Sequence, residues 1–290
     1  MEQETLGVIG GSGLYELPGI EAVEPVRSTT PFGTPSDELM RGRLGARTVV
    51  FLPRHARGHR LLPSEINFRA NIFAMKQLGV EWLLSVGAVG SLREQLEPGH
   101  VVVPDQFIDR TVARPSTFFG RGIVAHVSLA DPVCPVLSTV VAAATAAAGG
   151  TVHRGGTYLC MEGPQFSTRA ESHLYRQWNA DIIGMTAWQE AKLAREAEIC
   201  FASLALVTDY DCWKADADHV VIADVLRILA ANADLARRAV AGVAQQLPAS
   251  RDCGCAHALD HAIITDPSRI PTSVRTELAP VIGRVLGDKA

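Results

Sequence analysis

The sequence predicts an α/β fold in which helices cover a largely parallel central sheet. The first observation is a series of short apolar runs, each of strand length and bounded by Gly, Pro or charged residues. The second is that longer helical patterns separate several of these runs. The third is that 47% of the 290 residues are apolar, which is enough for a sizeable core. There is no linker-like tract and no internal repeat, so we expect one domain over residues 1–290.

Six apolar runs are the expected strands of this sheet. Each is short, and each is followed by a turn or by a change to a polar composition. In chain order they are Leu6–Ile9, Thr48–Leu52, Trp82–Val86, His100–Val103, Asp181–Gly184 and Phe201–Val207.

Five segments carry helical patterns. The expected helix Ser64–Leu78 starts with a Ser cap after Pro63, has Glu65 in its first turn and ends before Gly79. An Ala-rich helix is expected over Pro135–Ala148. The others are Ser167–Asn179, Gln189–Glu198 and the long amphipathic segment Ala223–Gln246.

The C-terminal part of the chain gives no clear pattern. Residues 248–290 show no sustained helical or strand period. We expect them to form an extension that packs on the body of the protein or on a neighbouring subunit.

Charge and hydropathy argue against several classes of protein. The formal net charge of −4 lacks the basic excess of a nucleic-acid-binding protein. No apolar run reaches 18 residues, so no membrane span is expected. The run Leu6–Ile9 follows Glu2 and Glu4, and it is too short and too acidic at its flank for a secretory signal.

The cysteines indicate a reducing compartment. Six of them are scattered over a chain of this length, which is typical of the cytoplasm and not of a disulfide scaffold. Cys253-Gly254-Cys255 is the only close pair, and with His257 it makes an incomplete ligand set. The sequence therefore predicts ordinary thiols and no metal, with a redox-labile bridge between Cys253 and Cys255 as the alternative.

Three strand ends carry groups suited to an anion. Gly10-Gly11-Ser12-Gly13 follows the first strand, where glycines let backbone N–H groups approach an anion and Ser12 adds a hydroxyl. Arg54 and His55 follow the second strand, and Arg offers a fork of donors that matches phosphate. Ala88 lies among glycines at the end of the third. Each has a structural alternative, namely a tight turn, a surface Arg or a capping His, but together they favour an anion site.

A second group of residues suits a flat base and a sugar. Phe166 can stack on a base, and Met185 is an adaptable apolar surface for a ribose, although each could instead be a core residue. Asp209 and Asp211 follow the very apolar run Phe201–Val207. A carboxylate there is costly unless it is paired or used, so we expect a role in catalysis, with helix capping as the alternative.

In chain order these pieces resemble the purine nucleoside phosphorylase superfamily, and most closely its methylthioadenosine phosphorylase branch. The resemblance runs from Leu6 to about Ala233. The motifs that carry it are Gly-Val-Ile-Gly-Gly-Ser-Gly-Leu (7–14), Phe-Leu-Pro-Arg-His (51–55), Gly-Ser-Leu-Arg-Glu (90–94), Val-Pro-Asp-Gln-Phe-Ile-Asp-Arg-Thr (103–111), Glu-Gly-Pro-Gln-Phe-Ser-Thr-Arg-Ala-Glu-Ser (162–172) and Thr-Asp-Tyr-Asp-Cys-Trp (208–213).

The resemblance implies a nucleoside phosphorylase-like fold, with a central mixed sheet flanked by helices, and a role for each motif. It implies a metal-free, typically trimeric enzyme whose active site lies near the subunit boundary, with His59 as a contributor from a neighbouring subunit. Inorganic phosphate would be the co-substrate. It assigns phosphate binding to Ser12, Arg54, His55, Ala88 and Thr186 with Gly11 and Ser167 nearby, the base to Phe166, Asp209 and Asp211, the ribose to Met185, and the 5′ substituent to Ile222 and Val225.

Two positions favour an adenine base and therefore phosphorolysis of 5′-methylthioadenosine to adenine and 5-methylthioribose 1-phosphate. The oxopurine branch of the superfamily carries Glu and Asn where this chain has Ser167 and Asp209. A carboxylate accepts a hydrogen bond from a 6-amino group but meets a second acceptor at O6. The alternatives are phosphorolysis of 6-oxopurine nucleosides such as methylthioinosine or inosine, hydrolysis, and a non-catalytic nucleoside-binding module.

The chain departs from the branch in three places. Gly87 stands where close relatives have Thr, and Gln165 replaces a common Arg. Ala187-Trp188-Gln189-Glu190 replaces the usual Thr-Val-Pro-Glu. These departures bear on base preference and phosphate affinity.

Overall fold

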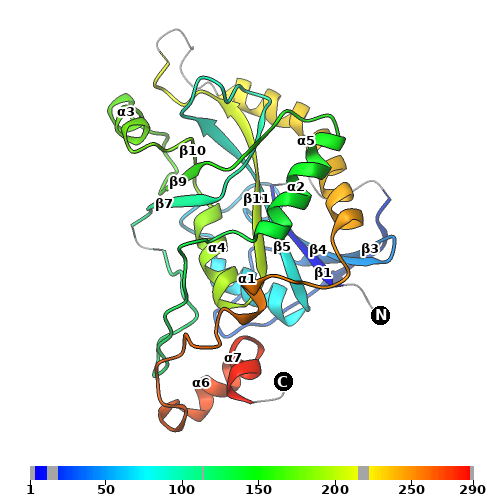
Figure 1. Ribbon diagram of the computed structural model, residues 1–290, viewed down its shortest axis with the longest axis vertical. Helices are drawn as coiled ribbons and strands as arrows, with labels where there is room; N and C mark the ends of the chain where they lie inside the picture. Colours follow the sequence, from blue (N-terminus) through cyan, green and yellow to red (C-terminus); the bar gives the residue numbers. More distant parts are fainter. Residues whose placement is uncertain (1–3, 12–18, 113, 215–221, 288–290) are drawn as a thin grey trace.

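The computed structural model describes residues 4–11, 19–112, 114–214 and 222–287. Its centre is a mixed sheet (Figure 1). Strand β1 (Thr5–Gly10) lies between β4 (Arg47–Pro53) and β5 (Val80–Ser91) and is parallel to both. Strand β11 (Cys200–Asp209) is parallel to β5 along almost its whole length. The carboxyl ends of these four strands therefore meet at one edge of the sheet, where α/β proteins bind ligands.

The rest of the sheet is partly antiparallel. Most strand pairs of the described residues are parallel, so the expectation of a largely parallel sheet is confirmed, and the antiparallel pairs make the sheet mixed, as the resemblance implies. The antiparallel pairs are β2 (Glu21–Val26) with β3 (Leu39–Leu44), β3 with β4, β10 (Ile182–Gly184) with β5, and β6 (Val101–Val103) with β11. Parallel pairs join β9 (Thr157–Met161) to β10 and to β7 (Gln106–Arg110), and β8 (Val152–Arg154) to β6.

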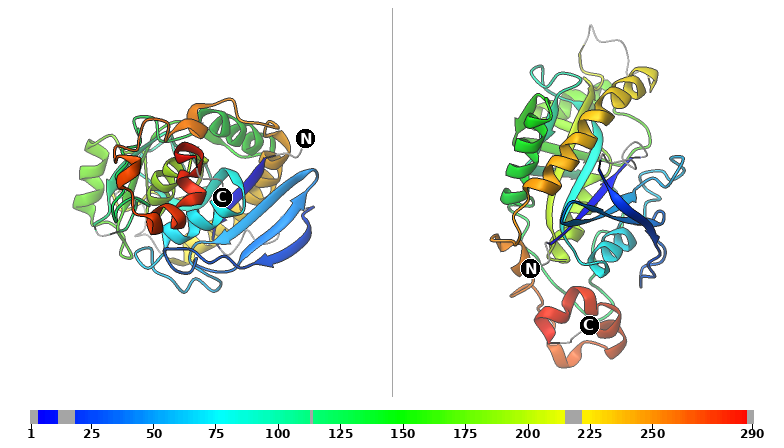
Figure 2. Two further views of the ribbon diagram at one scale, coloured as in Figure 1. Left: turned by 90° about the horizontal axis from the view of Figure 1, so that it is seen from below. Right: turned by 90° about the vertical axis from the view of Figure 1, so that its right-hand side faces the viewer.

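Helices cover both faces of the sheet (Figure 2). On one face, α2 (Pro135–Ala147) and α5 (Ile222–Gln246) pack on Trp82 and Leu84. On the other, α1 (Phe68–Gln77) and α4 (Ala187–Glu196) pack in a core that includes Leu83. This alternation of side chains is the expected period of a strand buried on both faces. Helix α3 (Arg169–Gln177) lies at the end of the sheet and starts with a capping box of Thr168 and Glu171.

The first helix begins later than the sequence predicts. Its cap is Asn67, whose side chain accepts a hydrogen bond from the Ala70 N–H, and not Ser64. Ser64 lies in a turn, in which the Glu65 carboxylate accepts from the Leu62 N–H at 2.8 Å. Asn and Ser cap helices about equally well. Here the cap is Asn67, so the helix starts three residues later than expected.

The C-terminal extension packs on the body of its own chain. It contains the short helices α6 (Thr272–Glu277) and α7 (Ala279–Leu286), and Val281 and Ile282 of α7 join the core around α1. The Arg284 guanidinium binds the buried carboxylate of Glu198 at 2.5 and 2.7 Å. Figure 2 shows this segment below α1. Across the described residues, no helix is long and apolar enough to cross a bilayer.

Candidate active site

A cavity of about 600 Å³ opens at the carboxyl ends of β1, β4, β5 and β11. The two groups of residues predicted from the sequence meet in it. From the anion group it is lined by Gly11, Arg54, His55, Ala88 and Thr186, and from the base and sugar group by Phe166, Met185, Asp209 and Asp211. His59 and Gly87 also line it. A volume of this size holds a small organic ligand.

Four predicted residues are not in this lining. Ser167 lies beside it, with its hydroxyl 3.5 Å from the sulfur of the lining residue Met161. Ser12 lies outside the described residues. Ile222 and Val225 belong to the first turns of α5, and their side chains are likewise outside the described part of the chain. Further along α5, the small residues Ala230, Ala233 and Ala236 line the cavity.

The two carboxylates sit where β11 ends. Asp209 Oδ2 accepts from the Thr208 hydroxyl and Oδ1 accepts from the Asp211 N–H, each at 2.7 Å. These bonds fix the plane of the carboxyl group. Burial raises the pKa of Asp209 above its ordinary value, and the two hydrogen bonds oppose this rise. Burial also raises the pKa of Asp211, and repulsion by Asp209 adds to it. A carboxyl group with a raised pKa can donate a proton as well as accept one.

The guanidinium of Arg54 is buried and paired inside the protein. Its Nε and Nη2 bind the two oxygens of the Glu190 carboxylate at 2.8 and 3.0 Å, and both side chains are almost fully buried. Nη1 donates to the Val86 carbonyl at 2.6 Å. The donor fork that sequence reasoning assigned to phosphate is therefore directed at Glu190. Arg54 also lines the cavity, and the second N–H of its Nη1 has no hydrogen-bond partner among the described residues.

Gly87 gives access to this remaining donor. A Cβ at Gly87 would lie 3.5 Å from Arg54 Nη1. Gly87 has no side chain to cover this edge of the guanidinium, which leaves a charged donor accessible.

His55 presents an acceptor to the cavity. Its Nδ1 is 2.8 Å from the Leu61 carbonyl oxygen, so Nδ1 carries the proton and Nε2 has a free lone pair. Burial lowers the pKa of His55 to about 4, and repulsion by Arg54 contributes, while the bond to Leu61 opposes the shift. The ring is neutral at physiological pH. It therefore accepts a hydrogen bond from a protonated ligand oxygen, whereas the sequence led us to expect a group that binds phosphate.

The start of α4 supplies further donors to the same side of the cavity. Thr186 is its N-cap and is buried, yet its hydroxyl makes no capping bond to the helix. The first N–H groups of a helix favour an anion. Ala88 is exposed near the end of β5 and also lines the cavity. These groups, Arg54 Nη1 and His55 lie on the anion side of the cavity.

An apolar wall faces the carboxylates. Phe166 is 49% exposed, which is unusual for a large aromatic side chain beside a cavity and leaves its ring open to a flat ligand. Gly163 has φ +67°, and a Cβ there would lie 2.5 Å from the Met185 sulfur. Only glycine therefore lets the loop carrying Phe166 pack against Met185.

Arg114 joins the loops that form this wall. Its guanidinium donates to the Glu162 carboxylate at 3.2 Å and to the backbone carbonyls of Glu162 and Met185. The sequence did not predict a role for Arg114, Thr208 or Glu190, because each acts through a neighbouring group. Thr208 and Glu190 stand in quoted motifs, whereas Arg114 belongs to none. The carboxylate of Glu162, which the sequence motif includes, serves to hold Arg114.

The unusual residues at the start of α4 point away from the cavity. Trp188 stacks on Phe107 with ring centroids 5.1 Å apart. Gln189 is fully buried and bonds Thr111 at 2.9 Å and Arg114 at 3.2 Å. Neither Trp188 nor Gln189 is among the residues that line the cavity.

This fold and site define the class of the protein: the chain belongs to the phosphorylase superfamily, whose family model matches residues 5–245. Curated relatives are S-methyl-5′-thioadenosine phosphorylases. One from Geobacter sulfurreducens is 55% identical over 97% of this chain and 99% of its own, and one from Koribacter versatilis is 54% identical over 99% and 98%.

Solved structures agree with these relatives. A methylthioadenosine phosphorylase sourced from an antarctic soil metagenomic library has a TM-score of 0.90, with 47% identity over 97% of this chain and 99% of its own. A mutant of the adenosine/methylthioadenosine phosphorylase of Schistosoma mansoni, in complex with methylthioadenosine, has a TM-score of 0.77 and 33% identity over 96% and 98%.

Proposed function

We propose that this protein is a pentosyltransferase that phosphorolyses 5′-methylthioadenosine to adenine and 5-methylthioribose 1-phosphate. The observation that carries the proposal is one cavity lined both by groups suited to an anion and by two carboxylates and an exposed aromatic ring. The curated relatives named S-methyl-5′-thioadenosine phosphorylase support the same reaction.

The two sides of the cavity act on the two ends of one bond. Phosphate, held by Arg54 Nη1, the start of α4 and Ala88, attacks C1′ of the ribose as the bond from C1′ to N9 breaks. Asp209, whose pKa is raised by burial, donates its proton to N7 and stabilises the leaving base. The sugar phosphate that forms keeps the charge of the phosphate but loses its hydroxyl proton. The lone pair of His55 Nε2 can accept this proton. Adenine gains the proton that Asp209 supplies, and solvent restores both groups.

Base selection rests on the fixed orientation of Asp209. Thr208 and Asp211 each occupy one lone pair of the carboxyl group, which leaves the others for the base. A 6-amino group pairs with a carboxylate oxygen, whereas O6 of an oxopurine would leave two acceptors facing each other. Asp211 holds Asp209 through its backbone N–H and acts as a positioning group. Phe166 and Met185 cover the base and the ribose, and Ser167 lies next to the base.

The remaining assignments follow from the family resemblance. Ser12 would complete the phosphate site, and Ile222 and Val225 would form an apolar slot for the methylthio group. The reaction would use phosphate as co-substrate and no cofactor at the cavity. A cytoplasmic homotrimer fits the cysteine content and the 49% exposure of Phe166, a ring that a neighbouring subunit near the site would cover. Sedimentation of the active enzyme tests the trimer.

A product assay tests the reaction. Methylthioadenosine, methylthioinosine, adenosine and inosine are supplied with and without phosphate, and free base and sugar phosphate are separated by chromatography. We expect adenine and 5-methylthioribose 1-phosphate from methylthioadenosine, and only when phosphate is present. Turnover that does not depend on phosphate would replace the phosphorylase by a hydrolase, and faster turnover of methylthioinosine would make the protein an oxopurine enzyme.

A further inference from the structure

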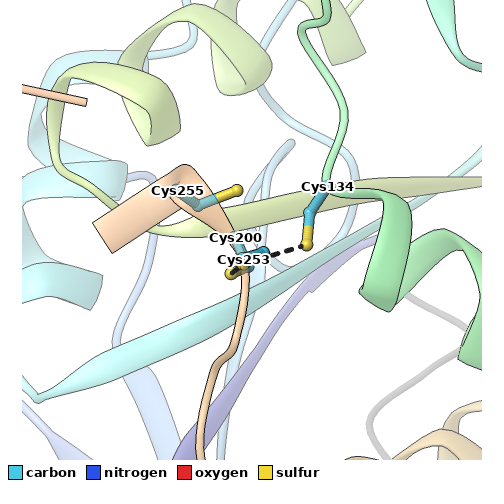
Figure 3. A group of neighbouring side chains, drawn as sticks. All are labelled: Cys134, Cys200, Cys253 and Cys255. Atoms are coloured by element: carbon cyan, nitrogen blue, oxygen red, sulfur yellow. Dashed lines mark hydrogen bonds between the residues drawn. The ribbon is translucent and has the colours of Figure 1, made fainter. Parts of the chain in front are cut away.

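Four cysteines from distant parts of the chain meet at the end of β11 opposite the cavity (Figure 3). Cys134 is the N-cap of α2, Cys200 is the first residue of β11, and Cys253 and Cys255 belong to the C-terminal extension. Their sulfur atoms all lie within 4.8 Å of one another. Figure 3 shows the four side chains directed toward a common centre.

The spacing of these sulfur atoms fits a single metal ion. Cys253 Sγ is 3.3 Å from Cys200 Sγ and 3.7 Å from Cys134 Sγ. Zinc binds four thiolates tetrahedrally with Zn–S bonds of about 2.3 Å, which places the sulfurs about 3.8 Å apart. The cysteines are free thiols, and their separations are far longer than the roughly 2.05 Å of a disulfide.

The surroundings suit a closed thiolate site. Cys134, Cys200 and Cys255 are buried, and Cys253 is half-buried. Cys134 Sγ accepts a hydrogen bond from the Leu137 N–H at the start of α2, where a helix favours negative charge. Arg195 brings positive charge close by, since its guanidinium binds the Asp131 carbonyl, three residues before Cys134.

The fold supplies a second pair of cysteines that the sequence does not show. Cys253 and Cys255 form a close pair, but a second pair was missing at metal spacing. In the fold, Cys134 lies beside Cys200 and forms this second pair, although 65 residues stand between them in the chain.

We propose that these four cysteines bind one zinc ion in a closed, structural site that ties the C-terminal extension to the sheet. Four Zn–S bonds form, the thiols give their protons to solvent, and no oxidant is needed. All four positions are filled by protein, so no position is left for water or substrate. The ten residues of β11 separate this site from Asp209 by roughly 30 Å. The metal therefore takes no part in phosphorolysis.

Metal analysis of the intact protein tests the proposal. The chain is produced in zinc-containing medium, purified under reducing conditions without chelator, and measured by plasma mass spectrometry together with its intact mass. We expect about one zinc per chain. Cobalt introduced in place of zinc should give the strong visible absorption of a tetrahedral thiolate site. A chain without metal would overturn the proposal, and so would a mass lower by two hydrogens for each disulfide formed between these cysteines.

Variants then assign the ligands. Cys253→Ser and Cys134→Ser should each lose the bound zinc and the cobalt spectrum. Cys160→Ser is the matched control, because Cys160 is fully buried but its sulfur contacts Gln189 and lies outside the cluster. It should keep the metal. Zinc retained in full by both cluster variants would show that the ion is held elsewhere. Because the wild-type chain is measured first, a variant that fails to fold leaves the test intact.

Discussion

The two ends of β11 contain opposite kinds of site. At the carboxyl end, Asp209 and Asp211 face a cavity of about 600 Å³ with an exposed Phe166 ring on its wall. At the amino end, Cys200 lies in a cluster with three other cysteines, of which two are buried and Cys253 is half-buried. The first site keeps groups available for a ligand that comes and goes. In the second site the four thiols lie against one another, which suits a permanent link between segments of the chain.

The difference follows from the topology. Strands β1, β4, β5 and β11 are parallel, so their carboxyl ends, with the loops that follow them, lie at one edge. At the opposite edge the chain enters strands, and the C-terminal extension crosses there to reach α1. The edge at the carboxyl ends can hold an open cavity, because hydrogen bonds such as those of Asp209 orient the side chains without filling the space between them. The opposite edge needs a contact that holds the C-terminal extension, which has little regular secondary structure there.

The largest expected effect is at the carboxyl end. Asp209→Asn removes the proton donor and turns one acceptor toward the amino group into a donor. We expect the kcat/KM for methylthioadenosine to fall by about 10²–10⁴, with preference shifting toward methylthioinosine. Steady-state kinetics on both nucleosides measures this. An unchanged ratio between the two substrates would remove Asp209 from base selection.

A second test concerns the buried pair behind the anion site. Arg54→Ala leaves the Glu190 carboxylate buried without a partner, which costs about 3–5 kcal/mol of stability. Arg54→Ala with Glu190→Gln should recover much of this stability, because no unpaired charge remains. Urea unfolding gives the two values. In the double variant the KM for phosphate should still rise more than the KM for the nucleoside, because Nη1 is missing. Equal changes in both KM values would make Arg54 purely structural.

The amino end should respond in stability and not in chemistry. Cys253→Ser should lower the free energy of unfolding by about 1–3 kcal/mol, because the C-terminal extension loses its link to the sheet. The KM values for phosphate and nucleoside should stay at the wild-type level. Urea unfolding and steady-state kinetics on the same preparation check both statements. A change in KM as large as that of Arg54→Ala would show that the two ends of β11 are coupled.

The sequence predicts the parts of the molecule that have a local pattern. All six apolar runs are strands, and all five helical segments contain helices, although the first begins at Asn67 and not at Ser64. Strand β2 was missed because it lies at the edge of the sheet and is largely exposed, so it has no apolar run. The short strands β8 and β9 follow each other across glycines and gain their pairing only from distant partners.

The same distinction holds for the sites. The motifs around Arg54 and Asp209 predict residues that do line the cavity, but not that the Arg54 fork is occupied by Glu190, 136 residues away. Nor does the sequence indicate that Nδ1 of His55 is engaged by Leu61. The cysteine cluster depends wholly on long-range packing. Local spacing identifies reactive groups, while partners from other elements decide their charge and direction.

The smallest effect, on stability against pH, concerns His55 at the carboxyl end. Its pKa is lowered to about 4 from an ordinary 6.5, so the unfolded chain binds a proton between these values that the folded chain does not. The stability associated with neutral His55 is complete above pH 6.5 and is lost as the pH falls toward 4. Asp209 and Asp211, whose pKa values are raised, act in the opposite direction. The wild type must therefore be compared with a variant that lacks only the imidazole.

His55→Asn provides that comparison, because its amide N–H can replace the Nδ1 bond to Leu61 without titrating. Urea unfolding of both proteins is measured from pH 7 to pH 4. The wild type should lose stability relative to the variant as the pH falls through this range, since only the wild type takes up the extra proton on unfolding. Parallel curves would mean that folding does not lower the pKa of His55, so that the ring is a cation in the folded protein below about pH 6.5 and not a neutral acceptor there.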